Sequence, residues 1–235
     1  MSKRAVILAG GKGTRLKPYT VSLPKPLVPI VDKPILEIII QQLAKNGFNH
    51  ITLTINHMAE IIKAFCGDGS KWGVKIDYSL EDIPLSTMGP LKLINDLPEN
   101  FLVMNGDVLT DLNFSGFYDF HIQKHNLFTI SSFQRQYIND YGVLEINQEN
   151  QLSNFKEKPV YHFEVSMGVY MANRKIIQMI PEGIPFGFDH LMYAMLKSNT
   201  KVAVKRHDSY WLDIGRPDDY EKAAQDYNSI IKNSL

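Results

Sequence analysis

The chain has 235 residues, of which 44% are hydrophobic, and this is enough apolar material for a packed core. The 25 basic residues balance the 25 acidic ones, so no overall field favours nucleic acid or an anionic membrane. No apolar run approaches a membrane span or a signal peptide, and the single cysteine, Cys66, suits a reducing compartment, so we expect a cytoplasmic protein.

Strand-like and helix-like segments alternate through the first half of the chain. A continuous apolar run at 4–9 is typical of a strand buried on both faces, and Pro34 and Gly47 bracket a helix over 35–46. Further strands are expected at 50–55, 74–79 and 101–104, and further helices at 59–66, 89–95 and 114–125. This alternation implies a parallel sheet with right-handed crossovers.

The second half is richer in strands. They are expected at 128–135, 142–146, 164–171 and 201–205, with helices at 189–197 and 217–230. No internal repeat or low-complexity linker divides the chain. The pattern therefore predicts a single α/β domain over residues 1–235 with a mixed, mostly parallel central sheet.

The first strand runs into a glycine-rich loop, Gly10-Gly11-Lys12-Gly13, and two further cations follow it, Arg15 and Lys25. Glycine lets backbone N–H groups approach phosphate oxygens, and the cations add charge that amides cannot supply. The pattern favours a polyphosphate site over its alternative, a tight turn after a strand.

Two common phosphate loops fail on particular residues. A P-loop needs Ser or Thr directly after Gly-Lys, but Gly13 follows Lys12 here. A dinucleotide-binding fold needs a carboxylate for the ribose at the end of the next strand, but that strand is followed by Asn56-His57.

The loop belongs to a longer pattern. Leu8-Ala-Gly-Gly-Lys-Gly-Thr-Arg-Leu16, with Pro24-Lys-Pro-Leu27 and Lys33-Pro-Ile-Leu36, resembles the signature of the sugar-phosphate nucleotidyltransferases, the NDP-sugar pyrophosphorylases. Later family motifs are matched in the same order by Pro84-Leu-Ser-Thr-Met-Gly-Pro90, Asn105-Gly-Asp107, Tyr141-Gly-Val143, Glu157-Lys-Pro159 and Trp211-Leu-Asp-Ile-Gly215. The resemblance covers nearly the whole chain and looks closest to the mannose- and heptose-1-phosphate guanylyltransferases.

This resemblance implies a Rossmann-like, glycosyltransferase-A type three-layer sandwich that binds nucleotide with its first half and sugar phosphate with its second. Nothing after Asp213 resembles the C-terminal β-helix of larger members, so we expect no acyltransferase activity. In the implied reaction a sugar 1-phosphate attacks the α-phosphate of an NTP and pyrophosphate leaves. The protein must align two anions and stabilise charge on the transferring group.

The resemblance assigns the triphosphate side to the loop and its two cations. Arg15 would stabilise charge at the α-phosphate and leaving pyrophosphate, and Lys25, stiffened by flanking prolines, would contact the α- or β-phosphate. The alternative for Lys25 is a solvated loop lysine. The implied nucleotide-binding positions of this part are Leu8, Ala9, Gly10, Gly11, Gly13, Thr14 and Gly106.

The sugar side is assigned to the second half, again by resemblance. Glu157 accepts hydrogen bonds from sugar hydroxyls, Lys158 holds the sugar-linked phosphate, and Gly142 presents its backbone amide where a Cβ would obstruct. The alternative is an ordinary exposed Glu/Lys pair in a charged stretch.

Two carboxylates are candidates for a metal site. Asp107 follows a buried strand at the carboxyl edge, where open α/β sheets bind ligands, and Asp213 follows Trp211-Leu212. Two carboxylates plus phosphate oxygens suit Mg²⁺. The alternatives are a turn former for Asp107 and a loop residue for Asp213. His121 and His125 lack a third ligand, so we expect surface or half-buried helix residues.

Glu81 stands where family members place a polar side chain on the base edge. A carboxylate only accepts hydrogen bonds, and guanine offers two adjacent donors, whereas uracil and thymine offer one donor between two carbonyls. Cytosine is intermediate. Glu81 therefore favours GTP, unless it is a solvated loop residue.

Two positions depart from the family pattern. Ser86 replaces a usual glycine, which costs on the order of 1 kcal/mol if φ is positive, although its N–H could still reach the base. Ser166 stands where relatives often have a sugar-contacting Asn, and its shorter side chain enlarges the pocket. Mannose is therefore not assumed, and a heptose 1-phosphate or a non-sugar phosphate stays open.

Two other functions remain as alternatives. One is a catalytically silent regulatory homologue that binds NDP-sugar, and another is the same chemistry with UTP or CTP. A true glycosyltransferase is disfavoured because Asp107-Val-Leu-Thr-Asp111 is not Asp-x-Asp. The sequence leaves the sugar, the pathway, the regulation and the oligomeric state open, a homo-oligomer included.

Overall fold

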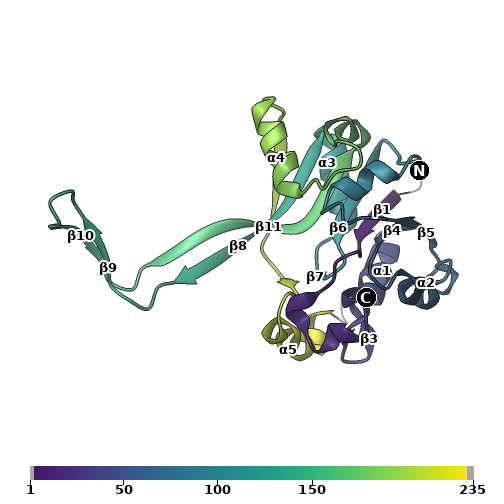
Figure 1. Cartoon of the computed structure of the whole chain (residues 1–235), viewed down its shortest axis with the longest axis horizontal. Coiled ribbons are helices and arrows are strands. Elements are labelled where there is room, and N and C mark those ends of the chain that lie inside the picture. Colours follow the sequence, from purple (N-terminus) through teal and green to yellow (C-terminus); the bar gives the residue numbers. More distant parts are fainter. Residues whose placement is uncertain (1–2, 232–235) are drawn as a thin grey trace.

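The computed structural model describes residues 3–231 (Figure 1). The first half contains β1 (Lys3–Leu8), β2 (Pro29–Ile30), β3 (Lys33–Pro34), α1 (Ile35–Lys45), β4 (Phe48–Ile55), α2 (Ala59–Cys66), β5 (Lys75–Leu80), β6 (Asn100–Asn105), β7 (Val108–Thr110) and α3 (Phe114–Gln123). The second half contains β8 (Phe128–Ile138), β9 (Val143–Ile146), β10 (Leu152–Lys156), β11 (Val160–Asn173), α4 (Phe188–Lys197), β12 (Val202–His207), β13 (Trp211–Asp213) and α5 (Pro217–Asp226).

Seven strands form the central sheet, in the order β12-β8-β11-β6-β1-β4-β5. All neighbours pair in parallel except that β11 runs antiparallel to both β6 and β8. The chain moves outward from β1 through β4 to β5 and then returns to place β6 on the other side of β1. The crevice beyond the carboxyl ends of β1 and β6 is therefore the switch point where open α/β sheets bind ligands.

Alternate residues of the central strands β1, β6 and β11 enter two separate apolar cores. Ala5 and Ile7 of β1 pack with α1, α2, α3 and α5 on one face of the sheet, and Val6 packs with α4 and short 3₁₀ segments on the other. The mixed, mostly parallel sheet thus lies between two helical layers. This confirms the predicted Rossmann-like three-layer architecture.

One part of the chain leaves this body. Figure 1 shows β8 and β11 continuing together as a long ribbon away from the sheet, with β9 and β10 at its far end. The pairing is unbroken from Ser132↔Ser166 at the sheet to Ile138↔Val160 along the ribbon. We call residues 134–164 the arm.

The predicted strands are present, most with shifted ends, and β11 is much longer than expected. The expected helix over 89–95 is a short 3₁₀ helix, Gly89–Leu93. The N–H groups of Met88 and Gly89 both donate to the carbonyl of Phe186, so this segment begins on a loop contact rather than on helical bonds. The last helix ends at Asp226, and a π-helical turn, Tyr227–Ile231, follows it.

The expectation for His121 is wrong. Its side chain is fully buried, with Nδ1 at 2.8 Å from Thr129 Oγ1 and Nε2 at 3.1 Å from Asn100 Oδ1, whereas His125 is exposed. Cys66 is buried. Among the described residues, no helix is both long and apolar enough to cross a membrane.

Candidate functional site

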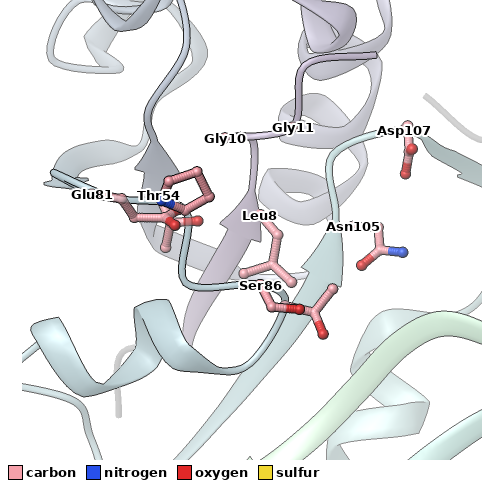
Figure 2. Close-up of a pocket in the computed structure, with 10 residues that line it drawn as sticks. Leu8, Gly10, Gly11, Thr54, Glu81, Ser86, Asn105 and Asp107 are labelled. Carbon is pink, nitrogen blue, oxygen red and sulfur yellow. The ribbon is translucent and has the colours of Figure 1, made fainter. Parts of the chain in front are cut away.

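A pocket lies at the switch point, over the carboxyl ends of β1, β4 and β6 (Figure 2). Strand β1 contributes Leu8, and the loop after it contributes Gly10 and Gly11. Figure 2 shows Glu81 on one side of this loop and Asp107 on the other. Six predicted site residues line the pocket together, namely Leu8, Gly10, Gly11, Glu81, Ser86 and Asp107.

The three glycines of the loop lie in different surroundings. A Cβ at Gly10 would lie 2.9 Å from Glu81 Oε1, so glycine is needed there for close packing. Gly13 has φ +60°, and a Cβ there would lie 2.9 Å from Lys25 Cβ. A Cβ at Gly11 would meet nothing within 4 Å, so the space beside this glycine is open to the pocket.

The remaining loop positions flank the pocket. The N–H of Ala9 donates to the carbonyl of Thr54 at 2.9 Å, which continues the β1–β4 pairing into the loop. Thr14 begins a 3₁₀ turn that places Arg15 at the surface. The N–H of Gly106 donates to the carbonyl of Leu8 at 3.0 Å, and a Cβ at Gly106 would lie 2.9 Å from the same oxygen.

Lys25 and Asp107 form an ion pair through Asp107 Oδ2. The Lys25 side chain is 11% exposed and that of Asp107 is 21% exposed, so both charges are largely removed from water. Lys25 is therefore a half-enclosed site cation and not a solvated loop lysine.

Asp213 is brought to the same place by a short strand pair. Strand β13 runs antiparallel to β7, so Asp213 lies opposite Val108, and the N–H of Ile214 donates to the carbonyl of Asp107 at 3.0 Å. Asp219 holds the following turn by accepting from the N–H groups of Gly215 and Arg216 at 3.1 and 2.9 Å. The two predicted metal ligands are thus neighbours.

The electrostatics of Asp213 reflect this placement. Burial raises the pKa of its carboxyl, the negative charge of Asp107 raises this pKa further, and the cations Lys25 and Arg15 oppose both effects. The guanidinium of Arg15 also lies beside Gly215, where a Cβ would be 3.8 Å from its Cζ. Two carboxylates and two cations therefore share one cluster.

The chemistry of the two carboxylates fits a divalent cation. Asp107 Oδ1 is buried and has no hydrogen-bond partner, although Oδ2 is paired with Lys25. In the described part of the chain no third His, Cys, Asp or Glu joins them as a cluster. Mg²⁺ suits such a sparse set because it retains waters and takes phosphate oxygens as further ligands.

Glu81 is a buried side chain and not a solvated one. It is 7% exposed, and its Oε2 accepts a hydrogen bond from the N–H of Leu85 at 3.0 Å. Burial raises the pKa of the Glu81 carboxyl, and the Leu85 N–H opposes this shift. The N–H of Leu85 therefore holds the carboxylate in place. Glu81 lines the pocket, and its carboxylate can accept further hydrogen bonds there.

Ser86 has φ +66°, which is the left-handed conformation in which an L-residue is strained. The sequence-based concern about this position is therefore correct. The residue is exposed and lines the pocket opposite Gly10.

Four pocket residues were not assigned from the sequence, namely Thr54, Pro84, Thr87 and Asn105. Thr54 is 1% exposed, and its Oγ1 has no hydrogen-bond partner among the described residues. A buried hydroxyl without a partner is rare, so Thr54 is a further candidate for a ligand contact. The available signal was a threonine at the end of an apolar strand beside the glycine loop.

Ser166 lies at the base of the arm, next to the body. Its Oγ donates to the hydroxyl of Tyr170 at 3.1 Å and accepts from the N–H of Gly168 at 3.2 Å. Gly168 packs against Asn105, because a Cβ there would lie 2.6 Å from Asn105 Nδ2. Because Asn105 lines the pocket and Gly168 packs against it, Ser166, which bonds to the N–H of Gly168, lies close to the pocket.

The other predicted sugar-side residues are elsewhere. Gly142, Glu157 and Lys158 lie on the exposed arm beyond the last β8–β11 pair. A strand rises about 3.3 Å per residue, so the ladder from Ser166 to Val160 alone places them about 20 Å from the sheet. The structure therefore does not bring Lys158 to the cluster around Asp107.

The comparisons with known proteins agree with this geometry. The family model described as nucleotidyl transferase matches residues 4–230. This chain belongs to that family. The predicted resemblance to sugar-phosphate nucleotidyltransferases is thereby confirmed.

Three relatives indicate the range of the family. A UTP–glucose-1-phosphate uridylyltransferase of Synechocystis is 32% identical, over 94% of this chain and 62% of its own. A mannose-1-phosphate guanylyltransferase catalytic subunit beta of Dictyostelium discoideum is 32% identical, over 98% and 66%. HddC of Yersinia pseudotuberculosis, solved with GMP-PN, superposes with a TM-score of 0.74 at 28% identity, covering 96% of this chain and 99% of HddC. The chain spans less than two thirds of those two curated relatives.

Proposed function

We propose that this protein transfers a nucleotidyl group from an NTP, preferably GTP, to a sugar 1-phosphate. An oxygen of the sugar phosphate forms a bond to the α-phosphorus, and the bond between that phosphorus and the bridging oxygen breaks. Pyrophosphate leaves with the electron pair. The proposal rests above all on the cluster of Lys25, Asp107, Asp213 and Arg15 beside the open glycine loop.

Each group in this cluster has a task that suits its position. The N–H groups of the loop and Arg15 bind the β- and γ-phosphates, which become the leaving group. The Lys25 ammonium, held on Asp107 in the free protein, turns to the α-phosphate when the triphosphate arrives. Because both prolines beside Lys25 limit backbone motion, this exchange needs only side-chain rotation.

We further propose Mg²⁺ as the metal, held by Asp107 and Asp213. When bound there, it neutralises phosphate charge during the transfer. The unpartnered Asp107 Oδ1 supports this assignment, as does the shared position of the two carboxylates.

The preference for GTP rests on Glu81. Its buried carboxylate offers acceptors only, which match the two adjacent donors of guanine. The guanylyltransferase relative of Dictyostelium discoideum and the GMP-PN complex of HddC support this interpretation. The uridylyltransferase relative keeps UTP as the competing nucleotide.

A panel assay tests the proposal. The protein is incubated with each of four NTPs, Mg²⁺ and a set of sugar 1-phosphates, and pyrophosphate is measured. Release with one matched pair, greatest with GTP, is the expected result. Nucleotide-sugar binding without pyrophosphate release from any pair would instead favour a silent regulatory homologue. The single-domain organisation and the cytoplasmic location remain predictions.

A further inference from the structure

The arm carries Glu157 and Lys158, but it holds them too far from the pocket of the same chain to act there. Given the proposed function, Lys158 binds the sugar-linked phosphate and Glu157 the sugar hydroxyls. In the described part of the chain, the side chains of these two residues make no hydrogen bond or ion pair. A lysine side chain cannot span the distance of about 20 Å that the strand rise gives.

The arm also cannot fold back without breaking its own structure. Seven consecutive residue pairs join β8 to β11 from Ser132↔Ser166 to Ile138↔Val160, and the only irregularity in the ladder lies between Ser166 and Tyr170. Returning Lys158 to the pocket of the same chain requires a sharp bend inside this regular ladder. An extended arm that reaches another molecule keeps every pair.

The arm exposes apolar side chains of the kind that proteins usually bury. A two-stranded ribbon is marginal on its own in water. Yet the arm exposes nine large apolar side chains, namely Tyr137, Ile138, Tyr141, Leu144, Ile146, Leu152, Phe155, Val160 and Phe163. Such a concentration marks an interface.

One face of the arm continues into the body. Tyr137, Tyr161, Phe163 and Arg135 share this face because they are cross-strand partners or lie two residues apart. It runs into Phe133, whose ring lies 5.5 Å from that of Trp211, and Arg135 lies 4.9 Å over the same indole. Trp211 belongs to β13, the strand that ends at Asp213. The apolar face therefore leads directly to the catalytic cluster.

We propose that two copies of this chain exchange arms, so that each copy supplies Glu157 and Lys158 to the site of the other. A second copy is the partner because only another nucleotidyl-transfer site needs these two residues. The exchange is an isologous, two-fold arrangement in which both apolar arms are covered at once. This inference rests on the proposed function for the roles of Glu157 and Lys158, but not for the association.

Association is tested first, by sedimentation equilibrium. The wild type is expected at about twice the chain mass of 26.8 kDa. The double variant Tyr137→Asp/Phe163→Asp should be a monomer with an unchanged far-UV spectrum and melting temperature of the body. The matched control, Tyr193→Asp/Leu196→Asp on exposed positions of α4, should stay dimeric. A monomeric wild type, or a dimer that the arm variant leaves intact, overturns the proposal.

Exchange is tested by complementation between two inactive variants, Lys158→Ala and Asp107→Asn, co-expressed with different affinity tags. If arms are exchanged, a mixed dimer holds one intact site, so random mixing restores about a quarter of wild-type pyrophosphate release. If each arm serves its own chain, both sites of the mixed dimer are damaged and nothing is restored, which overturns the proposal. Asp107→Asn mixed with Asp213→Asn is the control and should stay inactive in either case.

Different results would contradict the proposed function and the arm exchange. A wild type that releases no pyrophosphate with any substrate pair removes the proposed function, and sedimentation still decides whether the arms associate. An active wild type without complementation removes only the exchange.

Discussion

The carbonyl oxygen of Asp107 accepts a hydrogen bond of 3.0 Å from the N–H of Ile214. Through this bond, and through the β7–β13 pair that it extends, two carboxylates far apart in the sequence become neighbours. The backbone therefore positions the candidate metal site, and removing either carboxylate should leave the fold intact.

The first prediction concerns these two carboxylates. Asp107→Asn and Asp213→Asn should each lower the rate of pyrophosphate release by about 100-fold or more, because a charge that positions the transferring phosphate is lost. Chelation of divalent cations should abolish wild-type release, and added Mg²⁺ should restore it.

The control is Asp119→Asn, an exposed position on α3, which should leave the rate unchanged. Circular dichroism and thermal melting confirm that each variant is folded. Full activity in a folded Asp107→Asn or Asp213→Asn protein would remove that residue from the metal site.

The second prediction concerns the base. Glu81→Gln should lower kcat/KM for GTP by about 10- to 100-fold relative to UTP, because an amide places a donor against the guanine donors. The measurement is kcat/KM with four nucleotides at one fixed sugar 1-phosphate. Glu60→Gln on the exposed face of α2 is the matched control. An unaltered GTP-to-UTP ratio in the Glu81 variant means that another residue reads the base.

The third prediction concerns backbone strain. Ser86→Gly should raise the free energy of unfolding by about 1 kcal/mol, because glycine adopts a φ of +66° without the steric cost that serine bears. Urea denaturation provides the measurement. Ser70→Gly, at an exposed 3₁₀ position, should instead lower stability slightly. Equal effects at the two positions would show that Ser86 is not strained.

The fourth prediction concerns pH. Burial lowers the pKa of His121 from 6.5 to about 4, so the folded protein holds this ring neutral while the unfolded chain protonates it. Between pH 6.5 and about 4 the unfolded state therefore binds more protons. Stability must fall as pH falls through this window, and the shift corresponds to about 3 kcal/mol.

The measurement is urea denaturation at pH 7 and pH 4 for the wild type and for His121→Gln. The variant is less stable at pH 7 because it disturbs the bonds to Thr129 and Asn100, but it should lose about 3 kcal/mol less on acidification. His125→Asn, at an exposed residue with positive φ, should follow the wild-type pH dependence. Parallel pH profiles for His121→Gln and the wild type would contradict the assignment.

Much of the fold can be predicted from short stretches of the sequence. The buried run of β1, the glycines after it and the Pro34 and Gly47 boundaries of α1 are short-range signals, and the structure has these elements in the predicted order. The predicted nucleotide side of the site follows from them, since Glu81 and Asp107 come just after β5 and β6 at the same carboxyl edge of the sheet.

Long-range arrangements were beyond such signals. Strands β7 and β13 have three residues each, and only their pairing across the chain makes them strands. The apolar alternation of residues 128–171 predicts strands but not their path, so the arm and the remote position of Lys158 were not foreseen. Thr54 was missed because a threonine in a strand is ordinary until its hydroxyl is found without a partner.

The reversed direction of β11 has a consequence for how this family can diversify. Parallel neighbours must be joined by a crossover that packs on the sheet, whereas antiparallel neighbours such as β8 and β11 can be joined by any hairpin. The length and tip sequence of residues 139–159 are therefore free to change without disturbing the seven-stranded sheet or the nucleotide pocket. Under the proposed function and arm exchange, acceptor choice and subunit pairing would therefore evolve in this one segment while the proposed triphosphate chemistry stays fixed.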